Sequence, residues 1–314
     1  MKPELVVMRR LAPETTMQRL AEGYRLHPLW EADDIPAFLE SARGARGLVT
    51  TGSIGADAAL IEALPNLEII ANFGVGVDKV EFDAVNGRGI VVTVTAGVLT
   101  DAVADLALAL WLAVLRRVAE ADRFVRAGRW PEGPFGSGRG ARGRTAGILG
   151  LGQIGRAVAQ RLAGFGVEIA YSDLAAVPDL PYRFMADPVA LAGESDFLIV
   201  CAAGGPGTAK LVNADVLSAL GPEGILVNVA RGSIVDEPAL IAALEAGRIA
   251  GAGLDVFADE PNVPQALMAM DTVVLMPHQA SNTVETRIAM GENVLANLDA
   301  HFAGRPVPTP YREL

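Results

Sequence analysis

The sequence predicts an α/β protein with two parallel sheets, each covered by helices on both faces in the doubly wound arrangement. Short apolar runs alternate with helix-like segments along the whole chain. Gly, Pro or Asp residues interrupt the apolar runs and separate one from the next, which is typical of buried parallel strands. The runs form two groups, and a length of 314 residues favours about two domains.

The predicted strands follow from these apolar runs. In the first group they are residues 5–8, 48–50, 67–72 and 90–94. In the second group they are residues 146–149, 169–172, 197–200, 225–229, 253–256 and 273–276. Helices between consecutive strands act as crossover connections, so each group should form a parallel sheet.

A long helix over residues 100–120 separates the two groups. The loop at 128–144 is rich in Gly, Pro and Arg. Its arginines could bind phosphate, but the acidic composition of the chain favours a solvated connector. The last helix, at about 283–302, begins with Asn282 and has Glu285 three residues on, which resembles a capping box.

Composition limits the partners. A net charge of −11 repels nucleic acid and acidic membrane surfaces, so we expect neither as a partner. The single cysteine, Cys201, excludes an intramolecular disulfide and favours a cytoplasmic location. The N-terminus does not resemble a signal peptide, and the apolar run 106–115 is too short to span a bilayer. No metal site is predicted.

The strongest motif is Gly-x-Gly-x-x-Gly, which follows the apolar run at 146–149. Gly150 would allow a sharp turn, Gly152 a close approach of backbone to a pyrophosphate, and Gly155 close packing of helix on strand. The amides of Gln153 and Ile154 would lie at a helix N-terminus, where phosphate binds. The alternative is a plain turn, because the chain has 34 glycines.

Asp173 supports the dinucleotide interpretation. It follows the next apolar run, close to the spacing of about 20 residues expected for a carboxylate on a ribose hydroxyl. The motif lies in the middle of the chain. A Rossmann-like unit is therefore predicted to be inserted into the other domain.

The chain has three histidines, which narrows the search for an acid or base. His27, before a proline, and His301, on the last predicted helix, are expected at the surface. His278 instead follows an apolar run, at the carboxyl end of a predicted strand, where α/β sheets bind ligands. Arg231 and Glu260 follow two other predicted strands.

These three side chains suit reduction of a 2-oxo acid. Arginine can grip a carboxylate and polarise a carbonyl. Histidine can give a proton to the carbonyl oxygen as hydride arrives at carbon, and a neighbouring carboxylate would favour the imidazolium and orient it. The alternative is that Arg231 and Glu260 are surface ion-pair residues.

A resemblance favours the first interpretation. The chain resembles the D-2-hydroxyacid dehydrogenases in motif order over nearly its whole length. Within them it is most similar to the branch of glyoxylate/hydroxypyruvate and hydroxyphenylpyruvate reductases. The matching stretches are residues 55–61, 73–80, 150–155, 228–233, 253–257, 260–261, 277–281 and 283–287.

The resemblance implies a reversible reduction of a small 2-oxo acid, such as glyoxylate or hydroxypyruvate. His278 would be the acid/base, Glu260 its partner, and Arg231 the anchor for substrate carboxylate and carbonyl. The backbone amides of Val75 and Gly76 would bind the carboxylate, although spacing alone gives an ordinary turn there.

The resemblance also implies a set of cofactor contacts. Asp255 would bond to the nicotinamide carboxamide, and Cys201 and Thr208 would line the cofactor groove. As a lone cysteine, Cys201 is expected to be a packing residue rather than a chemical one. The full predicted set is Gly150, Gly152, Gln153, Ile154, Gly155, Asp173, Cys201, Thr208, Val229, Ala230 and Asp255.

The architecture implied by the family is a flavodoxin-like substrate domain, residues 1–98 and 284–314, and a Rossmann cofactor domain, residues 99–283. Homodimers are usual in the family. Trp130 matches a position that can reach toward the partner's active site and so bind substrate, or it is an exposed interface residue.

One departure concerns the cofactor. Reductases of this branch often use NADPH, with a Ser-Arg type pair where this chain has Asp173-Leu174. An aspartate would repel a 2′-phosphate, so NAD is expected, with NADP as the alternative. Another alternative is an NAD(H)-sensing binding protein of the corepressor type. Long tails are typical of such proteins, and none is expected here.

Overall fold

The computed structural model describes residues 2–312 of the chain. The chain divides into two compact units. Unit 1 runs to Leu99 and resumes at Ser281, and unit 2 is Thr100–Ala280. The sequence placed these boundaries at 98/99 and 283/284. Each unit is a parallel sheet with helices on both faces, which confirms the predicted fold class.

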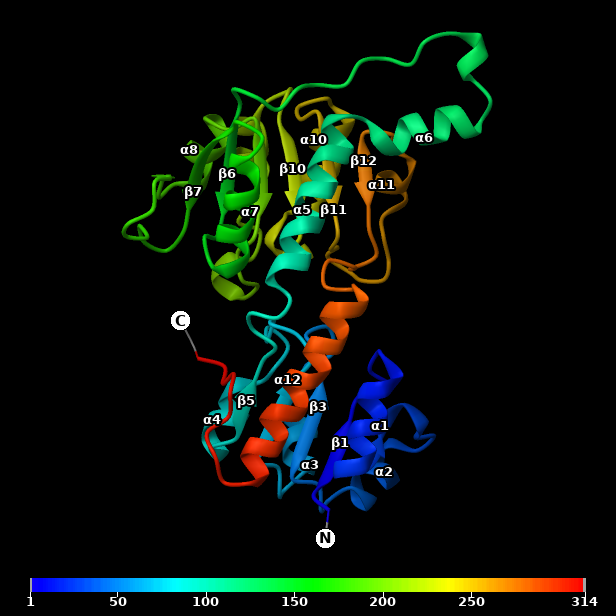
Figure 1. Ribbon diagram of the computed structural model, residues 1–314, viewed down its shortest axis with the longest axis vertical. Helices are drawn as coiled ribbons and strands as arrows, with labels where there is room; N and C mark the ends of the chain where they lie inside the picture. Colours follow the sequence, from blue (N-terminus) through cyan, green and yellow to red (C-terminus); the bar gives the residue numbers. More distant parts are fainter. Residues whose placement is uncertain (1, 313–314) are drawn as a thin grey trace. The chain divides into compact units, whose positions relative to one another are not determined.

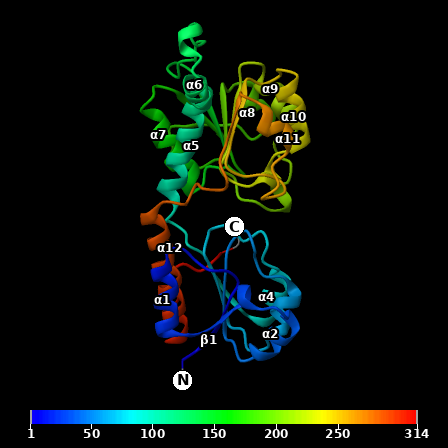
Figure 2. The same ribbon diagram turned by 90° about the vertical axis from the view of Figure 1, so that its right-hand side faces the viewer.

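The sheet of unit 1 has the order β2-β1-β3-β4-β5, and all its pairs are parallel. This is the flavodoxin-like order. The strands are β1 (Glu4–Val7), β2 (Arg25–Pro28), β3 (Gly47–Thr50), β4 (Ile69–Asn72) and β5 (Val91–Thr93). Helices α1 (Glu14–Gly23) and α12 (Val284–Phe302) cover one face (Figure 2). Helices α2 (Ile35–Ser41), α3 (Ala58–Ala63) and α4 (Phe82–Arg88) contribute to the core on the other.

The sheet of unit 2 has the order β12-β11-β10-β9-β6-β7-β8. Chain order reverses between β6 and β9, which gives the switch point where such sheets hold ligands beyond their carboxyl ends. The strands are β6 (Thr145–Leu149), β7 (Glu168–Ser172), β8 (Arg183–Phe184), β9 (Phe197–Val200), β10 (Ile225–Asn228), β11 (Gly251–Leu254) and β12 (Val273–Leu275).

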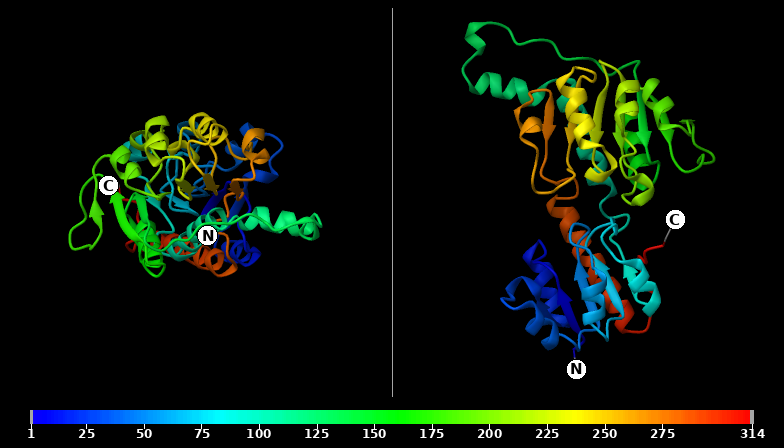
Figure 3. Two further views of the ribbon diagram at one scale, coloured as in Figure 1. Left: turned by 90° about the horizontal axis from the view of Figure 1, so that it is seen from above. Right: turned by 180° about the vertical axis from the view of Figure 1, so that it is seen from behind.

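Helices also cover both faces of the sheet of unit 2. One face carries α5 (Thr100–Leu115) and α7 (Gln153–Ala163) (Figure 2). The other carries α8 (Pro188–Gly193), α9 (Ala214–Leu220), α10 (Glu237–Glu245) and α11 (Gln265–Ala269), and the view from behind in Figure 3 faces it. Trp111 of α5 is fully buried, edge-on to Phe165 and Phe197.

The predicted long helix 100–120 is wrong, because it breaks after α5. Arg117 has a left-handed backbone, with φ of 55°, and α6 (Val118–Arg126) begins after it. Helix α6 and the loop that follows extend beyond the sheet of unit 2 (Figure 1). Most residues of the loop 128–144 are exposed, and Arg144 at its end pairs with Asp196 at 2.7 Å.

Two strands were missed, and one of them buries a histidine. β2 is an edge strand with a charge and a proline, and β8 is only two residues long. His27 lies in β2, 8% exposed, with Nε2 2.8 Å from Glu4. The side chain of His301 is 17% exposed and 3.2 Å from Glu68. The prediction that His27 is a surface residue is therefore wrong, whereas His301 is partly exposed.

The cap of the last helix lies one residue further on than predicted. Thr283, not Asn282, caps α12, and its hydroxyl accepts from the amide of Thr286 at 3.1 Å. Asn282 instead accepts from the guanidinium of Arg287. Within residues 2–312, no helix combines the length and the apolarity needed to cross a membrane.

Candidate active site

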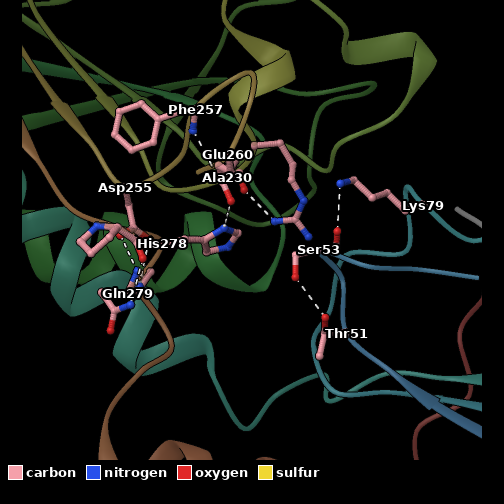
Figure 4. A network of polar contacts seen from close by, with 12 residues as sticks. Thr51, Ser53, Lys79, Ala230, Asp255, Phe257, Glu260, His278 and Gln279 are labelled. Atoms are coloured by element: carbon pink, nitrogen blue, oxygen red, sulfur yellow. Dashed lines mark hydrogen bonds and ion pairs between the residues drawn. The ribbon is translucent and has the colours of Figure 1, made fainter. Parts of the chain in front are cut away.

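Unit 2 places the three predicted catalytic residues in loops that follow β10, β11 and β12. Figure 4 shows Glu260 and His278 pointing toward one another. His278 Nδ1 lies 2.7 Å from Glu260 Oε2. With Nδ1 engaged by the carboxylate, Nε2 is the ring nitrogen left for an external group. The two side chains remain partly accessible, at 39% and 29% exposed.

The loop that carries His278 is held by Asp255. The Asp255 carboxylate, which is fully buried, accepts from the amides of Gln279 at 2.6 Å and Ala280 at 2.9 Å. The amide of His278 donates to the Asp255 carbonyl at 2.8 Å. His278 itself has φ of 53°, a left-handed backbone that costs energy for a residue with a side chain. The clamp holds His278 in this conformation.

The charge on Glu260 is set by opposing effects. Burial raises its pKa, but the hydrogen bond and charge of His278, the amide of Phe257 and the charge of Arg231 together lower it below its usual range. The amide of Phe257 donates to Oε1 at 3.1 Å. Glu260 therefore stays ionised to lower pH than an ordinary glutamate and presents a full negative charge to the imidazole.

A clamp of the same kind holds Arg231. Asn228, the buried last residue of β10, donates to the carbonyl of Arg231 at 2.9 Å and accepts from the amide of Ala230 at 3.1 Å. A Cβ at Gly232 would lie only 1.9 Å from the carbonyl carbon of Phe257. Glycine therefore lets the Arg231 loop touch the loop that leads to Glu260.

The glycine-rich motif has the geometry of a dinucleotide cradle. Gly150 has φ of 88°, and a Cβ there would lie 2.5 Å from Cα of Ala202. A Cβ at Gly155 would meet the Gly150 carbonyl at 2.1 Å, whereas one at Gly152 would meet no atom within 4 Å. Helix α7 begins at Gln153, so the first amides of the helix border this open space. These features fit a bound pyrophosphate.

Asp173 lies at the end of β7 and ties the motif to the sheet. Its carboxylate accepts from the amides of Leu151 and Leu174, each at 2.7 Å. The side chain of Leu174 is 93% exposed. Within the described chain, Asp173 is thus a negative charge beside the motif, and its neighbour supplies no positive charge.

Other predicted cofactor residues lie after β9 and β10. Thr208 donates through its hydroxyl to the Ala203 carbonyl at 2.7 Å. Burial raises the pKa of Cys201 to about 12, so its thiol stays protonated at neutral pH and is a packing group rather than a nucleophile. Val229 is buried, and Ala230 is partly exposed.

The predicted substrate loop belongs to unit 1. Val75 and Gly76 follow β4 and are partly exposed. Lys79, which also follows β4, donates to the carbonyl of Ser53 at 2.9 Å. Ser53 lies in the loop after β3, where its hydroxyl is 3.0 Å from that of Thr51 (Figure 4). Trp130, in unit 2, is 68% exposed in the 3₁₀ turn Trp130–Glu132.

Sequence reasoning gave no role to Asn72 or Asn228 and missed the clamp made by Asp255. These three residues are 1%, 1% and 0% exposed, and each ends or follows a buried strand. The signal was available, because a polar residue that closes an apolar run must satisfy its hydrogen bonds in the loop beyond. Within residues 2–312, no group of three or more His, Cys, Asp or Glu side chains could hold a metal ion.

Comparison with known proteins places these features in context. A family model described as the NAD-binding domain of D-isomer specific 2-hydroxyacid dehydrogenases matches residues 108–280. A hydroxyphenylpyruvate reductase of Plectranthus scutellarioides is 46% identical over 93% of this chain and 94% of its own length. A 2-ketogluconate reductase of Gluconobacter oxydans is 43% identical over 98% of both chains.

A solved structure is also similar over the whole chain. It is the NADPH-dependent glyoxylate/hydroxypyruvate reductase of Sinorhizobium meliloti in complex with NADP and malonate. It is 45% identical, has a TM-score of 0.94, and the match covers 99% of this chain and 97% of that one.

Proposed function

The chain belongs to the D-isomer specific 2-hydroxyacid dehydrogenase family, and we propose that it reduces glyoxylate and hydroxypyruvate, with His278 as the proton donor. It is an NAD(P)-dependent oxidoreductase that acts on the CH–OH group of 2-hydroxy acids. The observation that carries the proposal is the 2.7 Å contact between His278 and Glu260 in a loop cluster that also includes Arg231.

In the proposed reaction each residue has one task. The nicotinamide, when bound, supplies the hydride. The Arg231 guanidinium grips the substrate carboxylate and polarises the carbonyl. His278 gives the proton on Nε2 to the carbonyl oxygen, and Glu260, bonded to Nδ1, stabilises the charged imidazole before that transfer. In the reverse direction the neutral imidazole takes the proton back.

Reductase activity should fall as the pH is raised. We expect this fall to occur at a lower pH in the Glu260→Gln variant than in the wild type. The ionised carboxylate favours a proton on the imidazole, and the amide does not. The measurement is kcat/KM for hydroxypyruvate against pH. Glu237→Gln is the matched control, because the Glu237 carboxylate accepts from the amide of Ala258 in the same region. Superimposable profiles for Glu260→Gln and wild type would refute the pairing.

The cofactor is NAD or NADP, and we propose a preference for NADH. The observation is the Asp173-Leu174 pair, where a carboxylate can accept from a ribose 2′-hydroxyl and would repel a 2′-phosphate. The nearest downstream base, Arg183, is paired with Glu194. The Sinorhizobium meliloti relative is NADPH-dependent, so this position is where the two proteins should differ.

The double variant Asp173→Ser, Leu174→Arg should move the preference toward NADPH, because it removes a repulsive charge and adds an attractive one. The measurement is kcat/KM for both cofactors in wild type and variant. Leu174→Arg alone is the control for added charge. A wild type that already prefers NADPH would show that a base from elsewhere, such as Arg183, reaches the site.

We propose that the protein is a homodimer joined through α6 and the loop after it. Val118 and Val125 of α6 are 54% and 51% exposed, and Trp130 is 68% exposed, on a segment that extends from unit 2. Apolar side chains gathered in this way mark interaction surfaces. Sedimentation velocity should give the mass of two chains, and a single-chain mass at micromolar concentration would exclude this assembly.

The alternative substrate class is aromatic. The relative from Plectranthus scutellarioides is a hydroxyphenylpyruvate reductase, at 46% identity. Initial rates with glyoxylate, hydroxypyruvate, pyruvate, phenylpyruvate and hydroxyphenylpyruvate test the choice. A kcat/KM higher for the aromatic acids would favour that alternative over the one proposed.

A further inference from the structure

Asn72 is a buried polar residue at the end of an apolar strand. It is the last residue of β4 and is 1% exposed, and the three residues before it are fully buried and apolar. The loop with Val75 and Gly76 starts at the next residue. Asn72 thus lies directly beneath the segment that the proposed function assigns to the substrate carboxylate.

One side-chain amide fixes two carbonyls of this loop. Asn72 Nδ2 donates to the Gly74 carbonyl at 3.1 Å and to the Gly76 carbonyl at 2.9 Å. The Gly74 carbonyl also accepts from the Thr95 amide at 2.9 Å. Asn72 Oδ1 has no hydrogen-bond partner among residues 2–312. The side chain is therefore held through the two N–H donors of its amide nitrogen.

Fixing the carbonyls also fixes the amides. In a trans peptide the C=O and the following N–H point in opposite directions. The Gly74 carbonyl points to Asn72, so the N–H of Val75 points away from it. The N–H of Gly76 belongs to the next peptide group. That group lies between the two peptide groups whose carbonyls, those of Gly74 and Gly76, are fixed by Asn72. Neither N–H donates to any backbone or side-chain acceptor of the described chain, so both are open to an anion.

We propose that Asn72 is a positioning residue for the substrate carboxylate, because it directs the N–H groups of Val75 and Gly76 toward it. The inference rests on the proposed function of the loop. An asparagine suits the task because its NH₂ group offers two donors on a short stem. An ionised aspartate of the same shape offers none, and it would place a negative charge against two carbonyls and close to the bound carboxylate.

The test is Asn72→Asp, with Asn72→Ala as a second variant that adds no charge. Oxamate is an analogue that is not reduced. We expect KM for glyoxylate and Ki for oxamate to rise about 10–100-fold, which is the change expected when hydrogen bonds to a charged group are lost. NADH affinity and kcat at saturating glyoxylate should change much less. At lower pH the aspartate variant should recover part of its affinity, because a neutral carboxyl regains one donor.

Asn66→Asp is the matched control. Asn66 is exposed in the same unit, and its amide donates to the Arg43 carbonyl at 2.9 Å, so the charge change is the same and KM should stay constant. A lower melting temperature with unchanged KM and Ki in both Asn72 variants would overturn the inference. A wild type that reduces no 2-oxo acid would instead overturn the proposed function.

A measurement without variants covers the case in which neither Asn72 variant folds. In the wild-type protein with NADH, oxamate should slow hydrogen exchange at the amides of residues 75 and 76, because both would donate to its carboxylate. Unchanged exchange at these amides, at an oxamate concentration that inhibits the enzyme, would remove the loop from carboxylate binding and Asn72 with it.

Discussion

Replacing His278 with alanine is expected to lower kcat for 2-oxo acid reduction by about 10²–10⁴-fold, the contribution typical of a general acid. The carbonyl oxygen must gain a proton as hydride arrives at carbon. In the proposed reaction His278 gives that proton from Nε2, because Nδ1 lies 2.7 Å from Glu260. NADH should still bind, because the glycine-rich motif lies in a different loop.

The measurement compares steady-state kcat with the Kd for NADH from fluorescence titration. His301→Ala is the matched control, because His301 also contacts a glutamate but lies on α12 in unit 1. Its kcat should stay within a few-fold of wild type. If His278→Ala retained near wild-type kcat, His278 would not be the proton donor.

Arg231→Lys is expected to lower kcat/KM for the oxo acid by on the order of 10²-fold, although it keeps the positive charge. A planar guanidinium can contact carboxylate and carbonyl together, and an ammonium is a single point of charge. Asn228 fixes the backbone of the loop, so a lysine would start from the same Cα position as the arginine. NADH affinity should change little.

Arg248→Lys is the control, because Arg248 is an exposed arginine of the same unit. Initial rates over a range of oxo-acid concentrations separate the two variants. Unchanged kcat/KM for Arg231→Lys would mean that Arg231 serves only as a surface ion-pair residue.

The fold class was predictable because its signals are local. Each predicted strand was a short, mainly apolar run, and the structure has a strand that overlaps every one of these runs. The loops of Arg231, Glu260 and His278 could be placed at strand ends because helices return the chain to the same edge of a parallel sheet.

The misses depended on tertiary contacts. β2 lacks a continuous apolar run and is a strand because it pairs with β1. The break after α5 depends on a left-handed Arg117, whose guanidinium lies over the ring of Phe135. Neither the pairing of β2 with β1 nor the contact of Arg117 with Phe135 can be read from helical periodicity.

The site residues that the sequence missed act through hydrogen bonds to backbone. Asn72, Asn228 and Asp255 each hold a functional loop, and Asp255 does so across 24 residues of chain. The sequence shows that these polar residues end or follow apolar runs, but it does not show which backbone amide or carbonyl each one binds. That requires the fold.

One measurement on the unmodified protein tests the proposed activity. Purified enzyme is given hydroxypyruvate with NADH or NADPH, loss of the reduced nicotinamide is followed by absorbance, and the chirality of the product is determined. We expect turnover to D-glycerate, with a higher kcat/KM for NADH. Absence of turnover with either cofactor, or formation of L-glycerate, would contradict the proposed function.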